Sequence, residues 1–465
     1  MDEARVECSD GTFIGTLDRG MASFRGIPFT GEPPTGENRW MPPVPFEDGP
    51  RTHDATRFRP APPQRTGGRF AADEDCLYLN VWTDISVEAG RKPVVFWIHG
   101  GSFTSGSTSH PLYSGEGFVR ESPDIVFVSA GYRLGALGFM DVSAVPGGEG
   151  LSDSANLGLM DLGMALEWVH RNIQAFGGDP DNITLMGQSA GAACAVLLAS
   201  NKRYGSRVRR VIAQSGSPAF TVGPDRSPAV GAHVARSLGC RSVEELRSVP
   251  AETLGELSDS LSMKVWPVRS GITVPTDPYR ELEKRRIDIL AGSNLNEMDT
   301  FASYMGKEML METTRKAVSS LPEAGRRQLS DYLGSGEDLG RYLALGNWSL
   351  FSGPAEALAL CATASGGKGY RYLWKAPTGR PGYGAYHGAE LPAVLGNGSS
   401  PGYERIAAEA HRMWAEFARN GVPSDSWPVC DRDGKEYLVV GEAGFSTGEE
   451  PLPETVRWLE RRYML

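Results

Sequence analysis

One serine in this sequence stands where a nucleophile would. Ser189 lies in the run GQSAG at positions 187–191, between an apolar stretch at 183–186 and a helix-forming stretch at 190–200. This order predicts a strand, a sharp turn and a helix, with the serine held in a backbone conformation that costs about 1–3 kcal/mol. Small residues around the serine prevent collisions at the corner, and the helix N-terminus favours developing negative charge. The pattern therefore favours a catalytic serine over a structural turn.

A serine nucleophile also needs a group that stabilises negative charge, and a glycine-rich loop could supply it. The apolar stretch that ends at Ile98 runs directly into HGGSF at positions 99–103. Two adjacent glycines after a buried strand allow backbone N–H groups to point inward together. A flexible turn is the alternative, but HGG after a strand and upstream of GxSxG is typical of an oxyanion loop.

The base is sought among the histidines that follow the serine, because proteins with this kind of corner place serine, acid and histidine in that order. Three histidines follow: His233, His387 and His411. His411 falls within an amphipathic helical pattern and His233 within a polar insertion. His387 lies in the glycine-bracketed loop GAYHGAE, so it is the predicted base. Its spacing to Glu390 could also suit a metal, but no further ligand cluster accompanies the pair, so no metal site is predicted.

The acid is expected between the serine and the base, in a loop after a strand. The stretch 287–291 reads as a strand, and GSNLNE follows it. Glu297 is the predicted acid and Asp299 is the rival. The role of the acid would be to hold the imidazole in one tautomer and to stabilise the imidazolium.

The elements around these residues predict an α/β fold. Apolar runs at 94–98, 125–128, 208–213 and 370–374 suit strands buried on both faces, and amphipathic patterns at 160–176 and 403–421 suit helices. We therefore expect one domain over residues 1–465, with a central, mostly parallel sheet flanked by helices. Polar helical stretches at about 218–284 and 303–369 are expected to be cap insertions. Residues 10–82 are expected to form an antiparallel ribbon and loops at the edge of the sheet.

Composition excludes several classes of partner. The 465 residues carry a net charge of −10, which disfavours binding to nucleic acid or to an anionic membrane. The sequence has no apolar run of membrane-spanning length and no signal peptide at its start, so a cytoplasmic protein is expected. Its six cysteines form no CxxC pair and read as buried free thiols. The oligomeric state is left open.

Several ordered motifs together make the chain resemble the type-B carboxylesterase family, the cholinesterase-like α/β-hydrolases, in a bacterial form. The likeness covers nearly the whole chain. It implies an α/β-hydrolase fold without a cofactor, a triad of Ser189, Glu297 and His387, and backbone amides of Gly101, Ser102 and Ala190 as the oxyanion hole. It also implies that Ser215 supports the acid and that Phe103, Met263 and Phe301 form apolar pocket walls. The motifs that carry the resemblance are FRGIPF (24–29), EDCLYLNV (74–81), YRLG (132–135), NIQAFGGDP (172–180), QSGS (214–217), GSNLNEMDTF (292–301) and AYHGAELP (385–392).

The departures from the family pattern concern disulfides and pocket charge. The positions expected to pair with Cys76 and Cys240 hold no cysteine, the second being Glu245, which fits a reducing cytoplasm. Gln188 stands where the family usually has glutamate, which removes a negative charge beside the serine. Three further departures are Ser102, Met298 and Gly131; Ser102 needs only its amide, so activity should survive there.

The sequence thus predicts a serine hydrolase that cleaves small-molecule carboxylic esters through an acyl-enzyme. Amide or carbamate hydrolysis, or acyl transfer in a specialised pathway, would use the same triad and stays open. A non-catalytic binding protein is the remaining alternative, and the presence of all three triad residues argues against it.

Overall fold

The computed structural model describes residues 2–46, 51–65, 69–87, 90–261, 264–306, 339–377, 384–430 and 436–449, with a few single positions between 308 and 327. The chain divides into two compact units. The first comprises Met1–Arg210 and Phe220–Pro278, and the second comprises Val211–Ala219 and Tyr279–Leu465.

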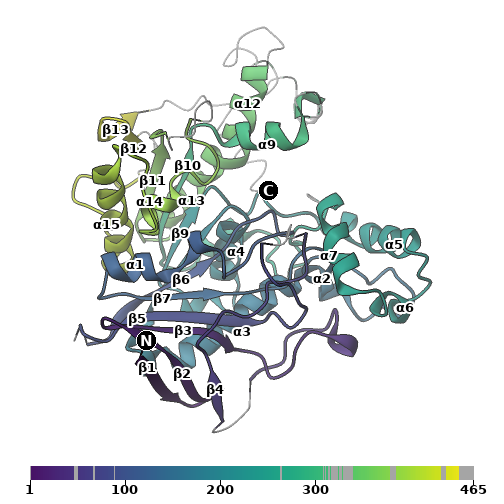
Figure 1. The fold of residues 1–465 in the computed structure, drawn as a ribbon. Coiled ribbons are helices and arrows are strands. Elements are labelled where there is room, and N and C mark those ends of the chain that lie inside the picture. Colours follow the sequence, from purple (N-terminus) through teal and green to yellow (C-terminus); the bar gives the residue numbers. More distant parts are fainter. Residues whose placement is uncertain are drawn as a thin grey trace. The chain divides into compact units, whose positions relative to one another are not determined.

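The first unit is built on a sheet whose strands run in the order β1-β2-β3-β5-β7-β6-β8 (Figure 1). β1 to β3 are antiparallel neighbours, β4 pairs with β2, and β6 pairs in parallel with both β7 and β8. This confirms the antiparallel ribbon predicted near the N-terminus. The strands are β1 (Asp2–Cys8), β2 (Gly11–Asp18), β3 (Met21–Pro28), β4 (Thr52–Asp54), β5 (Tyr78–Asp84), β6 (Lys92–Ile98), β7 (Val126–Ala130) and β8 (Gly178–Gln188).

The parallel strands of this unit are apolar because both faces of the sheet are covered. Every residue of β7 is buried, as are all but one of β6. α4 (Ala190–Ser200) is buried along its whole length, which its run of alanines and leucines permits. The helices of the unit are α1 (Gly115–Glu121), α2 (Gly135–Gly138), α3 (Leu157–Asn172), α4, α5 (Ser227–Ser237), α6 (Val243–Arg247) and α7 (Ala251–Ser260), with short 3-10 turns η1 (Gly36–Asn38), η2 (Pro111–Tyr113), η3 (Ser152–Asn156), η4 (Ile173–Phe176), η5 (Gly205–Arg207) and η6 (Pro224–Arg226).

The second unit contains strands in the order β9-β10-β11-β12-β13. β10, β11 and β12 are parallel, and β13 returns antiparallel to β12. α13 packs against β10 and β11, and Gly421 ends α15 in a left-handed conformation, as the Asn-Gly signal predicts. The elements are β9 (Arg210–Gln214), β10 (Asp288–Asn294), β11 (Gly369–Trp374), β12 (Glu436–Gly441), β13 (Gly444–Glu449), α8 (Pro278–Glu283), α9 (Glu297–Met305), α12 (Leu339–Asn347), the π-helical turn η7 (Trp348–Ser352), α13 (Gly353–Ala364), α14 (Leu391–Val394) and α15 (Glu404–Asn420).

The two stretches predicted as caps are only partly described. The first, 218–284, forms the helices α5 to α8, while much of the second lies outside the described residues. The C-terminal part of the second stretch forms α13, which flanks the sheet. Assignment of these stretches as caps on a single domain stays a prediction.

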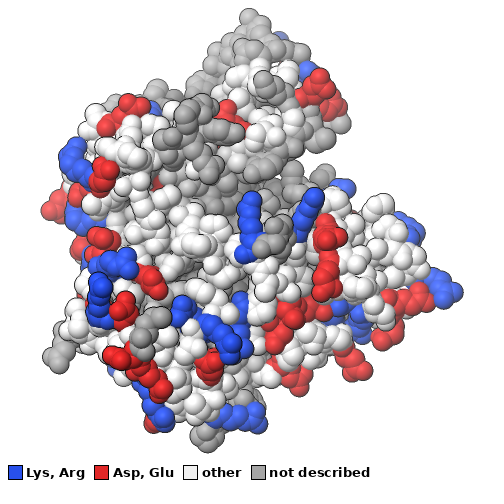
Figure 2. All heavy atoms as spheres, viewed as in Figure 1, with Lys and Arg blue, Asp and Glu red and all other residues white. Residues whose placement is uncertain are grey.

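The described surface carries charges of both signs, and the described cysteines form no disulfide. On the face shown in Figure 2, basic and acidic side chains of the described residues alternate. Among the described helices, none combines the length and the apolar character that a membrane span requires. All six cysteines are described, and none forms a disulfide. Four of them are buried as predicted, whereas Cys8 and Cys240 are partly exposed, so the prediction of buried thiols is wrong for these two.

Candidate active site

The turn between β8 and α4 holds Ser189 in a strained conformation. Its backbone angles are φ 58° and ψ −126°, where a residue with a side chain is rarely found. Ser189 directly precedes the first residue of α4, so it lies at the helix end where the first N–H groups have no partner within the helix. The predicted strand–turn–helix is confirmed, and Ser189 is 6% exposed.

Crowding explains the glycines that flank this serine. A Cβ atom on Gly187 would lie 2.4 Å from the carbonyl carbon of Gly191, and one on Gly191 would lie 2.1 Å from the carbonyl oxygen of Ile98. Both distances are far below van der Waals contact. Any larger residue would therefore move the turn away from the end of β6.

The loop after β6 lies beside the serine turn. A Cβ atom on Gly100 would come within 3.0 Å of the Cβ atom of Ser189. The next three residues, 101–103, all have positive φ angles, of 118°, 55° and 62°. The carbonyl of Gly101 accepts hydrogen bonds from the amides of Thr104 and Ser105, which closes the loop into a tight turn. A turn of this kind can bring neighbouring backbone N–H groups together, which is the arrangement that anion-binding loops use.

Two buried rings fix the start of this loop. The ring of His99 stacks on Tyr132 with centroids 4.6 Å apart, and the Tyr132 hydroxyl donates to the His99 carbonyl at 2.9 Å. Burial lowers the pKa of His99 to about 4, so this imidazole is neutral at physiological pH. His99 therefore supports the loop through its packing and does not contribute a charge to the site.

The second unit brings the predicted acid and base together. Oε2 of Glu297 lies 2.5 Å from Nδ1 of His387. Oε1 of the same carboxylate accepts hydrogen bonds from the hydroxyl of Ser215 and the backbone N–H of Asn294, both at 2.6 Å. Glu297 is fully buried, so these donors replace water around its charge. With Nδ1 committed to the carboxylate, Nε2 is the ring atom that can exchange a proton with a substrate.

The rival residues lie elsewhere. Asp299 follows in the first turn of α9, and its N–H donates to the carbonyl of Asn296. His233 is an exposed residue of α5, and His411 on α15 uses Nδ1 to contact the carbonyl of Val394. Glu297 and His387 are thus the acid and histidine that the structure pairs.

Sequence reasoning missed a second carboxyl group beside this pair. Glu390 is fully buried, and its oxygens accept hydrogen bonds from Nε2 of Gln214 at 2.9 Å and from Nδ2 of Asn294 at 2.6 Å. Burial, and next the charge of Glu297, raise the pKa of Glu390 from 4.5 to about 7. The signals were present in QSGS, GSNLNE and HGAE, but the contacts join residues that are far apart in the chain.

Two of the three predicted pocket residues, Phe103 and Phe301, make aromatic contacts. Phe103 is buried and packs edge-on against Phe139, with centroids 5.1 Å apart. Phe301 lies beside the imidazole of His387 at 5.1 Å between centroids, where Phe351 also packs. Met263 lies outside the described residues.

Among the described residues, no group of three or more His, Cys, Asp or Glu side chains is arranged to hold a metal ion.

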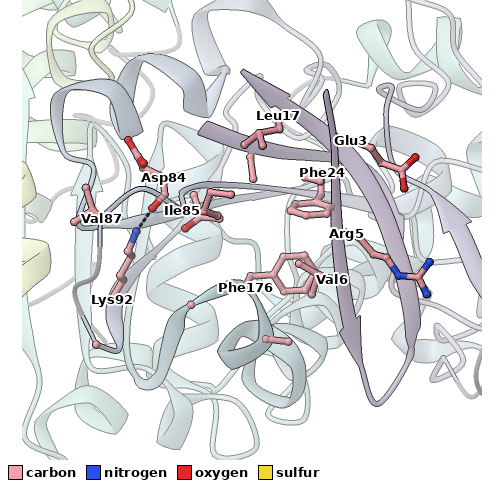
Figure 3. Close-up of a pocket in the computed structure, with 16 residues that line it drawn as sticks. Glu3, Arg5, Val6, Leu17, Phe24, Asp84, Ile85, Val87, Lys92 and Phe176 are labelled. Carbon is pink, nitrogen blue, oxygen red and sulfur yellow. Dashed lines mark hydrogen bonds between the residues drawn. The ribbon is translucent and has the colours of Figure 1, made fainter. Parts of the chain in front are cut away.

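A cavity of about 480 Å³ lies in the first unit near β1, β2 and β3 (Figure 3). Its walls include the edge-to-face pair Phe24 and Phe176, and the Lys92 ammonium beside it donates to the carbonyl of Asp84. None of the predicted site residues lines it.

Comparisons with known proteins show the family and the fold of this chain. The model of the carboxylesterase family matches residues 2–454. The chain is 31% identical to phenmedipham hydrolase of Pseudarthrobacter oxydans over 93% of its length and 94% of that protein, and 30% identical to para-nitrobenzyl esterase of Bacillus subtilis over 92% and 93%. The structure is similar to carboxylesterase EST55 of Geobacillus stearothermophilus, with a TM-score of 0.85, 32% identity and coverage of 99% and 100%. The fold is accordingly the α/β-hydrolase fold, and this chain belongs to the carboxylesterase family of carboxylic ester hydrolases.

Proposed function

We propose that Ser189, His387 and Glu297 form the catalytic triad of this esterase, and that the amides of Gly101, Ser102 and Ala190 form its oxyanion hole. The observation that carries the proposal is the left-handed conformation of Ser189, because strain of this size persists where a function requires it. The hydrogen bond between Glu297 and His387 supports it from the second unit.

The steps of the reaction follow from the chemistry of the proposed triad and oxyanion hole. Nε2 of His387 takes the proton of the Ser189 hydroxyl while the oxygen attacks the ester carbonyl, and three amides receive the negative charge of the tetrahedral intermediate. The intermediate collapses as His387 gives the proton to the departing alcohol. Water enters, loses a proton to His387 and attacks the acyl-enzyme, which releases the carboxylic acid and restores the serine.

The substrate class we propose is small-molecule carboxylic esters, with Phe103, Met263 and Phe301 as apolar walls. The aromatic contacts of Phe103 and Phe301 support this assignment. We also propose that the protein works in the cytoplasm, and the lack of a disulfide among its six described cysteines supports this.

The test is hydrolysis of a series of p-nitrophenyl esters, from acetate to long acyl chains, by the wild type and by Ser189→Ala. We expect the substitution to lower kcat by a factor of about 10⁴–10⁶. A fluorophosphonate probe should label Ser189 in the wild type, which peptide mass mapping can locate. The chain-length optimum would report the size of the acyl pocket.

Ser200→Ala is the matched control, because Ser200 ends the same helix and its hydroxyl donates only to the nearby carbonyl of Leu197 at 2.8 Å. It should keep wild-type rates. Equal activity in Ser189→Ala would refute the triad. A labelled Ser189 without ester turnover would instead point to amide or carbamate cleavage, or to acyl transfer.

A further inference from the structure

We infer that Asn294 is a positioning residue for catalysis, which clamps the loop carrying His387 on both sides and ties it to Glu390. This inference rests on the proposed function, because it concerns the same acid–base pair. All the groups involved belong to the second unit.

The clamp uses both hydrogens of one amide. Asn294 is the last residue of β10 and is 1% exposed. Its Nδ2 atom donates to the carbonyl of Tyr386 at 2.8 Å and to Oε2 of Glu390 at 2.6 Å. Tyr386 precedes His387 and Glu390 follows it by three residues. One side chain on a rigid strand therefore holds the loop before and after the imidazole.

Two strand ends serve the two carboxyl groups in the same way. At the end of β9, Gln214 donates to Glu390 and the next residue, Ser215, donates to Glu297. At the end of β10, Asn294 donates through its side chain to Glu390 and through its backbone to Glu297. Glu390 is therefore more than a polar residue that happens to lie in the core. It anchors the C-terminal side of the histidine loop to the same two strands that hold the acid.

The surroundings of Glu390 make this anchor sensitive to protonation. The titratable groups that act on it are Glu297 at the start of α9, His387 on the loop and Tyr372 on β11. Burial and the charge of Glu297 raise the pKa of Glu390 to about 7, and the hydrogen bond from Asn294 lowers it. Loss of the Asn294 amide should therefore raise that pKa further.

The amide cannot be replaced by a carboxylate of the same shape. Asn294→Asp would turn two donors into acceptors that face a carbonyl and a carboxyl group, so both contacts would become repulsive. The loop would lose its anchor on either side of His387. A misplacement of the base lowers the rate of the chemical step more than it weakens substrate binding.

The experiment measures kcat, KM and the pH profile of p-nitrophenyl ester hydrolysis for the wild type, Asn294→Asp and Asn294→Ala. We expect kcat to fall by about 10–100-fold in both variants, with KM changed by less than about threefold. In the wild type, Glu390 should give an inflection near pH 7. That inflection should move to higher pH in Asn294→Ala.

Asn296→Asp is the matched control, because Asn296 uses its oxygen to accept from the N–H of Ala385 at 3.2 Å, and aspartate keeps an acceptor there. The kcat of Asn296→Asp should stay within a few-fold of the wild-type value. Should the Asn294 variants fail to fold, Glu390→Gln weakens the same link from the other side, because glutamine keeps one acceptor oxygen where the carboxyl group offers two, and it has no proton to lose. That variant should also lose kcat and lack the inflection near pH 7.

Wild-type kcat in a folded Asn294→Asp, or a wild-type pH profile in both Asn294→Ala and Glu390→Gln, would overturn the inference. The proposed function fails separately. If Ser189→Ala remains active the triad is wrong, whereas an inactive Ser189→Ala beside a fully active Asn294→Asp refutes the clamp alone.

Discussion

The buried carboxylate of Glu297 receives hydrogen bonds from Ser215, from the backbone of Asn294 and from His387. A buried charge tolerates this position only because each donor compensates for lost water. The same donors fix the direction of the imidazole. At the scale of single residues, Glu297 would therefore act in the proposed triad through both its orientation and its charge.

A first prediction concerns the two acids between which the sequence could not fully decide. Glu297→Gln keeps the shape but removes the charge and can force the wrong imidazole tautomer, so kcat should fall by about 10³–10⁴-fold. Asp299→Asn, two residues later on the same helix, should retain most activity. Steady-state kinetics on p-nitrophenyl acetate compares the two, and the reverse ranking would make Asp299 the acid.

At this scale the sequence pointed to the pair of residues that the structure brings together, Glu297 and His387, but not to most of the residues that support them. Their catalytic roles stay a proposal. Ser189, Glu297 and His387 could be chosen because each follows a readable strand and stands in a motif. Asn294 and Glu390 also stand in motifs, but their contact could not be read from the sequence because 96 positions separate the two residues. The pocket residue Met263 stays a prediction.

Among the elements, the turn after β8 depends on the end of β6. α4 can begin only where Gly191 lets its backbone approach the carbonyl of Ile98. The motif was readable from sequence because the steric demand is local. By contrast, the steric demand on Gly131 is not local in the sequence, because a Cβ atom there would lie 2.7 Å from the carbonyl oxygen of the distant residue Cys76.

A second prediction tests the element-level contact. Gly191→Ala places a methyl group 2.1 Å from the Ile98 carbonyl oxygen, so the turn must shift. Overpacking of this kind costs about 1–3 kcal/mol, and displacement of the nucleophile by about 1 Å can lower the rate 10²-fold. Thermal unfolding and ester kinetics measure both effects.

Gly223→Ala is the control for that substitution, because no heavy atom lies within 4 Å of a Cβ atom placed there. It should leave both the melting temperature and the activity unchanged. If Gly191→Ala behaves in the same way, the crowding at the turn has no functional consequence.

For the whole molecule, the buried Glu390 links stability to pH. Its pKa is about 7 in the folded protein and 4.5 in an ordinary setting, so the native state holds a proton that the unfolded chain releases. Stability from this group is therefore fully present below about pH 4.5 and is lost as pH rises towards 7 and beyond, by an amount on the order of 3 kcal/mol.

A third prediction follows for Glu390→Gln, which has no proton to lose. The melting temperature of the variant relative to wild type should rise between pH 5 and pH 8. Glu409→Gln serves as control, since the hydrogen bond from Arg412 lowers the pKa of that exposed carboxyl out of the window. A constant difference between Glu390→Gln and wild type across this range would contradict the assignment.

The hydrogen bond between Glu297 and His387 lies wholly within the second unit, whereas the serine turn and the glycine loop lie wholly within the first. This division gives laboratory evolution a natural boundary. Libraries that vary residues 99–106 and 188–192 can search for altered ester specificity while the paired residues Glu297 and His387 are inherited unchanged. Libraries around β10 and the histidine loop can vary the pH dependence of the enzyme without altering the turn that carries Ser189.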